Sequence, residues 1–140
     1  MKIIITSGKR KRAIAKAILR EGKGIVRINS QLLQTYQPLI ARDKIMEPLI
    51  LSGDVYGKVN IQVSVTGSGW QSQAEAARLS IARALVNYNK NLKKTFMDYD
   101  RNLLIQDIRR AESSKPNDSK PRAARQKSYR WGEKMIIPIR

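Results

Sequence analysis

The clearest pattern in the chain is the strict alternation of apolar and polar residues from Lys58 to Thr66, KVNIQVSVT. Three valines and an isoleucine share one parity and polar side chains share the other, which predicts a strand with one buried and one polar face. Apolar residues then recur every three or four positions over about 71–89, as on an amphipathic helix. Ser72 and Glu75 fit the capping box that begins such a helix.

The first thirty residues predict a hairpin. A short β-branched run at 3–8 is followed by residues 12–20, which are rich in alanine but also alternate, so they fit either a helix or a strand. The Gly-rich turn at 21–24 and the β-branched residues after it favour strands. We therefore predict two antiparallel strands, at roughly 12–20 and 24–29.

The remaining elements are shorter. Helical spacing indicates helices at 31–36 and 39–51, and Pro48 should end or kink the second of these. A basic helix is predicted at 91–97 and a last short strand at 103–105. The sum is an α+β fold in which helices cover one side of a mainly antiparallel four-stranded sheet. The predicted domains are a globular body, 1–108, and an extended basic tail, 109–140.

Charge and missing residue types narrow the function. The net charge is +17, with 28 Lys or Arg against 11 Asp or Glu, and a chain of this size is strained by such self-repulsion unless a polyanion neutralises it. The absence of Cys and His excludes disulfides, thiol nucleophiles and imidazole chemistry. We expect no cofactor and no metal. No signal peptide or membrane-length apolar run is recognisable, so a soluble cytoplasmic protein is expected.

Positive charge gathers at two places. Lys9–Arg12 is a run of four cations, and Arg109–Arg130 holds eight Lys or Arg with almost no aliphatic side chains. The second segment cannot bury enough apolar surface to order itself, so we expect an extended arm. Nucleic acid is the partner that suits both clusters. A solvated linker remains the alternative for the arm, and a membrane surface is disfavoured because no basic helix with bulky aromatics is present.

Two pairs within the body are ambiguous. Arg78 and Arg83 lie off the apolar stripe of the long helix, where they would either meet phosphate or form a solvated basic face. Asp98 and Asp100 could hold Mg²⁺ as a nuclease does, but no other residue supports this and capping or pairing explains them better. The sequence therefore predicts a binding protein and not an enzyme.

Several short motifs stand out along the chain: GKRKRAIA at 8–15, REGKG at 20–24, KIMEP at 44–48, QA at 73–74, AAR at 76–78, IARAL at 81–85, YDR at 99–101 and QKSYR at 126–130. Together, and in this order over roughly residues 3–130, they resemble the archaeal and eukaryotic form of small-subunit ribosomal protein nine.

The resemblance implies a left-handed βαβ fold, shared with the second domain of ribosomal protein five, seated on ribosomal RNA (rRNA) in the small-subunit head beside other head proteins. The tail would run towards the decoding site and bring Lys127, Ser128, Tyr129 and Arg130 near the peptidyl-site tRNA. The rRNA contacts expected from charge and resemblance together are Lys9, Arg10, Lys11, Arg12, Arg78, Arg83, Arg109, Arg110, Lys120, Arg122 and Arg125.

The chain departs from the family in three places. Ile108 replaces the usual proline, and Pro, Ser, Asn and Asp occupy 113–119 where glycine is common. The chain also continues beyond Arg130 with WGEKMIIPIR, of which residues 135–140 resemble the start of the zinc-binding subunit N of archaeal RNA polymerase. A gene-boundary assignment and a true extension both explain these ten residues.

A second function fits the same charge and tail. A free architectural protein or RNA chaperone would also be basic and carry an extended tail. It would exchange readily among many nucleic acids, whereas a ribosomal protein would remain bound to one particle.

Overall fold

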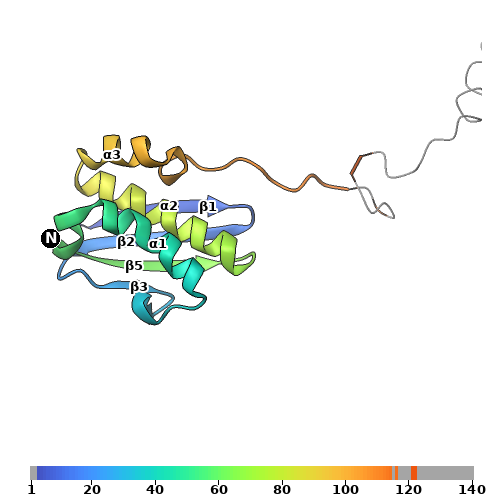
Figure 1. Ribbon diagram of the computed structural model, residues 1–140. Coiled ribbons are helices and arrows are strands. Elements are labelled where there is room, and N and C mark those ends of the chain that lie inside the picture. The colour runs from blue at the N-terminus through green and yellow to red at the C-terminus, as the bar shows by residue number, and fades with distance from the viewer. Residues whose placement is uncertain (1–2, 115, 117–120, 123–140) are drawn as a thin grey trace, which may run out of the picture. The chain divides into compact units, whose positions relative to one another are not determined.

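The computed structural model describes residues 3–114, 116 and 121–122. It contains a mixed five-stranded sheet in the order β1-β2-β5-β3-β4, with helices α1 and α2 side by side on one face (Figure 1). The elements are β1 (Ile4–Arg10), β2 (Ala13–Glu21), β3 (Val26–Ile28), β4 (Gln31–Leu32), α1 (Leu39–Leu51), β5 (Val59–Thr66), α2 (Trp70–Tyr88) and α3 (Leu92–Tyr99), with 3₁₀ turns η1 (Leu33–Thr35), η2 (Gly53–Lys58) and η3 (Arg101–Leu103).

The α+β class is confirmed, and three of the four strand pairings are antiparallel, in keeping with the predicted mainly antiparallel sheet. The sheet has five strands and not the predicted four, and the predicted hairpin between β2 and β3 is wrong. β2 pairs antiparallel with β1 and β5, and β3 pairs parallel with the other edge of β5. The Gly-rich turn therefore carries the chain past the end of β5 and does not close a hairpin. The side chain of Asn60 on β5 holds this passage, because its Oδ1 accepts from the amides of Lys23 and Ile25 at 2.9 and 3.0 Å.

The true hairpin joins β1 to β2 through Lys11 and Arg12, and β1 was absent from the predicted sheet. Lys11 turns the chain with a positive φ of 53°. The length of β1 was missed because Gly8 and the basic residues after it carry no strand pattern, although pairing with β2 extends the strand to Arg10.

Local patterns also failed at four shorter features. Residues 31–36 form β4 and η1 instead of a helix, and the predicted strand at 103–105 is the end of η3 and a turn. The Asp100 side chain caps η3 by accepting from the Asn102 amide at 2.8 Å, which favours the turn over a strand. Helix α1 continues past Pro48 to Leu51, so the expectation that Pro48 ends the helix is wrong, and its missing N–H removes one hydrogen bond from the helix. Helix α2 begins at Trp70, so Ser72 lies buried inside it and forms no capping box.

The core lies between the sheet and the helices. β2 and β5 bury one parity, and the packed face of α2 is rich in alanine. Gly8 allows β1 to approach α2, since a Cβ on Gly8 would lie 2.3 Å from the Ala76 carbonyl oxygen and 2.8 Å from the Ser80 nitrogen. Thr6 reinforces this contact by donating to the Ser80 carbonyl at 2.7 Å. The alanines and Gly8 thus set how closely sheet and helix approach.

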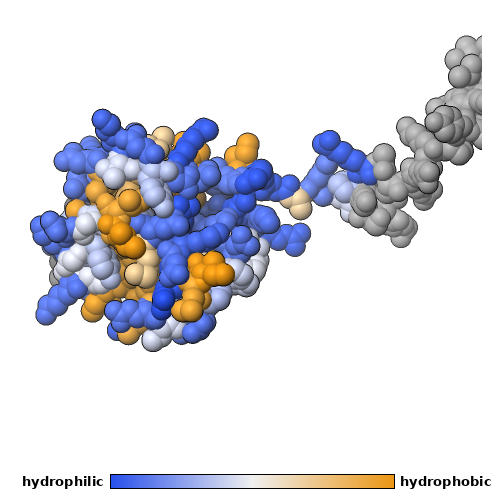
Figure 2. All heavy atoms as spheres, viewed as in Figure 1, coloured by the Kyte–Doolittle hydropathy of each residue, from blue (hydrophilic) through white to orange (hydrophobic). Residues whose placement is uncertain are grey.

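The outer side of the helix layer is mixed in polarity. Figure 2 shows apolar side chains scattered among hydrophilic ones on this side, and α1 contributes the exposed Leu39, Ile40 and Ile50. None of the helices in the described part of the chain has the length and apolar character needed to cross a bilayer.

The chain divides into a compact unit, Met1–Arg109, and a second unit, Arg110–Arg140. In the second unit, Arg122 Nε lies 3.0 Å from Glu112 Oε2, and both side chains are largely exposed.

We expect Gly8→Ala to lower the free energy of unfolding by about 1–3 kcal/mol, because the added methyl group overpacks the contact between β1 and α2. Chemical denaturation of the purified protein measures this. Gly57→Ala is the matched control, because nothing lies within 4 Å of its added Cβ. Equal stability of the two variants would contradict the close approach.

Candidate nucleic-acid interface

The four cations of Lys9–Arg12 do not share one surface. They occupy the end of β1 and the turn into β2, where successive side chains of a strand point to opposite faces. Lys11 and Arg12 are exposed at the tip of the hairpin, whereas Lys9 and Arg10 are half-buried. The run of four therefore divides into an exposed pair, Lys11 and Arg12, and a half-buried pair, Lys9 and Arg10.

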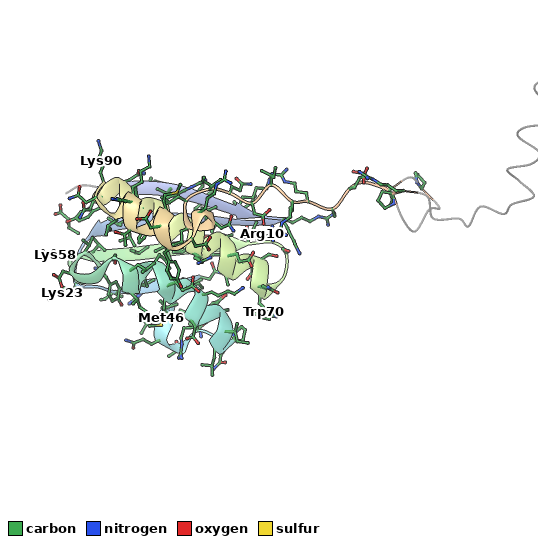
Figure 3. All side chains as sticks on the ribbon, turned by 45° about the horizontal axis from the view of Figure 1, so that its top comes forward. Arg10, Lys23, Met46, Lys58, Trp70 and Lys90 are labelled. Atoms are coloured by element: carbon green, nitrogen blue, oxygen red, sulfur yellow. The ribbon has the colours of Figure 1, made fainter. Side chains whose placement is uncertain are left out.

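Arg10, which is labelled in Figure 3, is held by two carboxylates. Its Nε lies 2.6 Å from Glu75 Oε2 on α2, and its Nη1 lies 2.7 Å from Asp107 Oδ2. Only 15% of the Arg10 side chain is exposed. Lys44 on α1 approaches the other oxygen of Glu75 at 3.4 Å. The group ties β1, α1 and α2 to the segment that leads out of the compact unit.

Arg78 has a similar arrangement one turn further along α2. Its guanidinium contacts Glu47 on α1, and its Nη1 lies 3.0 Å from Asp100 Oδ2 before η3. This side chain is also only 15% exposed. Arg78 therefore links the two helices to the chain that follows α3.

Arg83 binds backbone oxygens instead of carboxylates. Its Nη1 donates to the Ser7 carbonyl on β1 at 2.8 Å, and its Nε donates to the Leu104 carbonyl at 3.1 Å. It holds residue 104 against the edge strand. No pattern in the sequence could have revealed the internal roles of Arg10 and Arg78, because only the fold brings the few acids to them.

Asp107, near the end of the compact unit, interacts with two arginines. It accepts from the Arg109 amide at 2.9 Å and from Arg109 Nη2 at 2.7 Å, and it faces Arg10. The hydrogen bonds from Arg109, followed by the charge of Arg10, lower the pKa of Asp107 from 3.8 to about 2. The same pairing raises the pKa of Arg109 above its ordinary value.

Nothing in this arrangement resembles a catalytic centre. Asp100 pairs with Arg78 and caps η3, which accounts for one member of the suspected nuclease pair. Within residues 3–114 and the few described beyond them, no three carboxylates gather as metal ligands would.

Comparison with known proteins identifies the family of this basic, arginine-braced domain. Residues 8–130 match the family model of ribosomal protein S9/S16. The small ribosomal subunit protein uS9 of the archaeon Methanococcus vannielii is 45% identical over 134 residues, an alignment that covers 93% of this chain and all of that relative. The chain belongs to the ribosomal protein S9/S16 family.

The structure places some of the expected RNA contacts of this S9-family protein and not others. Arg109 and Arg110 are exposed at the end of the compact unit and the start of the next. Arg122 is exposed and pairs with Glu112. The remaining expected contacts lie outside the described residues: Lys120, Arg125, Lys127, Ser128, Tyr129 and Arg130.

Three exposed cations of the sheet were missed. Lys16, Arg20 and Arg27 lie on β2 and β3 at the parity opposite the buried residues. In the sequence they stand singly among apolar residues and form no cluster. The signal that could have revealed Lys16 and Arg20 is their alternation with the alanines of β2, because this alternation marks the face of the strand that the helices do not cover.

The pKa of Asp107 makes a measurable prediction. Because the folded pKa lies below the ordinary value, the carboxylate stabilises the fold above about pH 4, and this contribution is lost as the pH falls towards about 2. We expect Arg109→Ala to raise the pKa of Asp107, as followed by NMR of the carboxyl carbon. Arg110→Ala should leave it unchanged, and an unchanged pKa in Arg109→Ala would contradict the assignment.

Proposed function

We propose that the hairpin tip at Lys11 and Arg12 binds the phosphate backbone of small-subunit rRNA, and that the C-terminal segment reaches the peptidyl-site tRNA. As a member of the S9 family, the chain is a structural constituent of the small ribosomal subunit, where it binds rRNA beside other ribosomal proteins. It is not an enzyme, and it works in the cytoplasm as part of the ribosome.

The observation that carries the proposal is the contrast among neighbouring cations. Arg10 has two carboxylate partners, whereas Lys11 and Arg12 are exposed and have no ion pair within the described residues. An exposed cation without a partner can neutralise a phosphate of the nucleic acid, and the release of the counterions condensed on that nucleic acid drives binding. Such contacts position the protein and do not read base sequence.

The tail proposal rests on composition and on family membership. The arm from Arg109 to Arg130 spans about 70 Å when extended, enough to cross a large part of a subunit. Lys127 and Arg130 would neutralise phosphates, and Tyr129 would stack on a base or sugar. Ser128 would add a hydroxyl donor between them. Lys120, Arg122 and Arg125 would line the route through rRNA.

The fold supports one finer assignment. β3 and β5 are adjacent and parallel, and α1 lies in the connection between them, as in a βαβ unit. We propose that this unit has the left-handed connection implied by the family resemblance.

The test of the rRNA contact uses a charge-matched pair of variants. We expect Lys11→Ala with Arg12→Ala to reduce the amount of protein retained on small subunits after a sucrose gradient. The affinity of this double variant should also fall less steeply with salt, because each phosphate contact contributes about 0.7–0.9 to the salt slope. Lys93→Ala with Lys94→Ala removes the same charge from exposed positions of α3. Equal retention of both double variants would contradict the proposal.

The same gradient separates the proposal from the chaperone alternative. The unaltered protein should remain with the small subunit at one copy per particle in high salt. Movement of the unaltered protein to the top fractions would favour a freely exchanging architectural protein.

The tRNA contact requires a separate variant. We expect Arg130→Ala to weaken the retention of peptidyl-site tRNA on purified small subunits by several-fold, because one charge-assisted phosphate contact is lost. Subunit assembly should be unchanged, because the rRNA contacts remain. Unchanged tRNA affinity in subunits that contain the variant at full occupancy would disprove this role.

A further inference from the structure

The face of the sheet opposite the helices is open in the described structure. Figure 1 shows α1, α2 and α3 on the same side, and strand alternation leaves the other parity exposed. Along β2 and β5 this outer face carries Lys16 and Arg20 together with Gln62, Ser64 and Thr66, all of which are exposed. A sheet of this kind normally has its second face in water or against a partner.

The outer face is cationic and contains no acid. Lys9, Lys16, Arg20 and Arg27 belong to it, and none of them has an ion pair within the described residues. Glu21 is the single acid in the five strands, and it lies at the end of β2 on the helix-side parity.

The acids of the compact unit gather instead on the helix side. Glu47 on α1 and Glu75 on α2 meet Arg78 and Arg10, and Asp100 and Asp107 join the same groups. Charge is therefore segregated through the thickness of the domain. The helix side pairs Arg10 and Arg78 with acids, whereas the charged residues of the outer sheet face are cations alone.

The spacing of these cations suits an extended polyanion. Lys16 and Arg20 are four residues apart on β2, which places their Cα atoms about 13 Å apart. Arg27 pairs with Gln62, which in turn pairs with Ile18, so Arg27 stands two strands from β2, at about 10 Å. Separations of this size exceed the reach of one phosphate group. Each cation therefore meets a different phosphate along a chain.

The residues between the cations fit the rest of a nucleotide. Gln62, Ser64 and Thr66 form a row of hydrogen-bonding side chains along β5. Beside them Ile5 and Ile14 are 69% and 43% exposed and give the face an apolar component. RNA helices display 2′-hydroxyls, sugars and phosphates across a wide, shallow groove, which an uncovered sheet face can approach.

We infer that the outer sheet face is a second RNA-binding surface, which lies against the sugar–phosphate backbone of small-subunit rRNA through Lys16, Arg20 and Arg27. This inference rests on the proposed function and extends it from the hairpin tip to the whole open face. Contacts of cations with the sugar–phosphate backbone recognise shape and charge and do not read base sequence.

The absence of cysteine allows a direct test in assembled subunits. A single cysteine at Ser64→Cys, tethered to an iron chelate, places a source of hydroxyl radicals at the centre of the face, and Asn87→Cys on the exposed side of α2 is its control. The expected result is strong cleavage of rRNA from position 64 at nucleotides that the tether at position 87 does not cut.

The charge contribution is tested with the full-length protein and small-subunit rRNA. Lys16→Gln with Arg20→Gln should lower the slope of log affinity against log salt by about 1.4–1.8, the sum of two phosphate contacts. The control Lys93→Gln with Lys94→Gln loses the same charge from α3. A slope lowered equally by both pairs would mean that net charge alone matters, and the inference would fail.

A third tether at Arg12→Cys separates this inference from the proposed function. Cleavage from position 12 without cleavage from position 64 would overturn the sheet face and leave the hairpin tip intact. Absence of rRNA cleavage from both positions would overturn both this inference and the proposed contact at the hairpin tip. A photo-crosslink from position 64 to another ribosomal protein, in place of rRNA, would show that the face docks protein and would also overturn the inference.

Discussion

The structure depends on the internal pairing of arginines with the few carboxylates. Arg10 and Arg78 each bridge two acids and are only 15% exposed, so they act as braces between layers. Ion pairs at a protein surface contribute about 0–1 kcal/mol, but breaking a largely buried pair leaves a charge without water or partner and costs considerably more. The braces join α1, α2 and β1 to the residues after α3, and they fix where the chain leaves the compact unit.

The braces also explain how so basic a chain folds at all. A net charge of +17 opposes compaction. Here Glu47, Glu75, Asp100 and Asp107 meet Arg10 and Arg78 inside the domain, whereas the cations of the hairpin tip and of the open sheet face have no ion pair within the described residues. The first set of charges holds the fold, and we propose that the second set binds rRNA.

Arginine and lysine divide these roles by geometry as much as by charge. The guanidinium of Arg83 reaches two backbone carbonyls from one side chain, and that of Arg10 reaches two carboxylates. Its planar fork of donors makes arginine suited to bridging. The consequence is that counting cations overestimates the surface available to RNA, because the most obvious basic run contributes one member to the interior.

The sequence by itself determined the strand at β5, the helix at α2, the α+β class and the family, because these depend on local periodicity and on motifs. It did not determine which strands pair. The parallel contact of β3 with β5 joins residues more than thirty positions apart, and no local pattern encodes it. The same holds for the arginines: sequence marked Arg10, Arg78 and Arg83 as basic, but only the tertiary structure brings Glu75, Asp100 or a backbone carbonyl to them. It is this meeting of distant residues that separates the charges that hold the fold from those left free to bind.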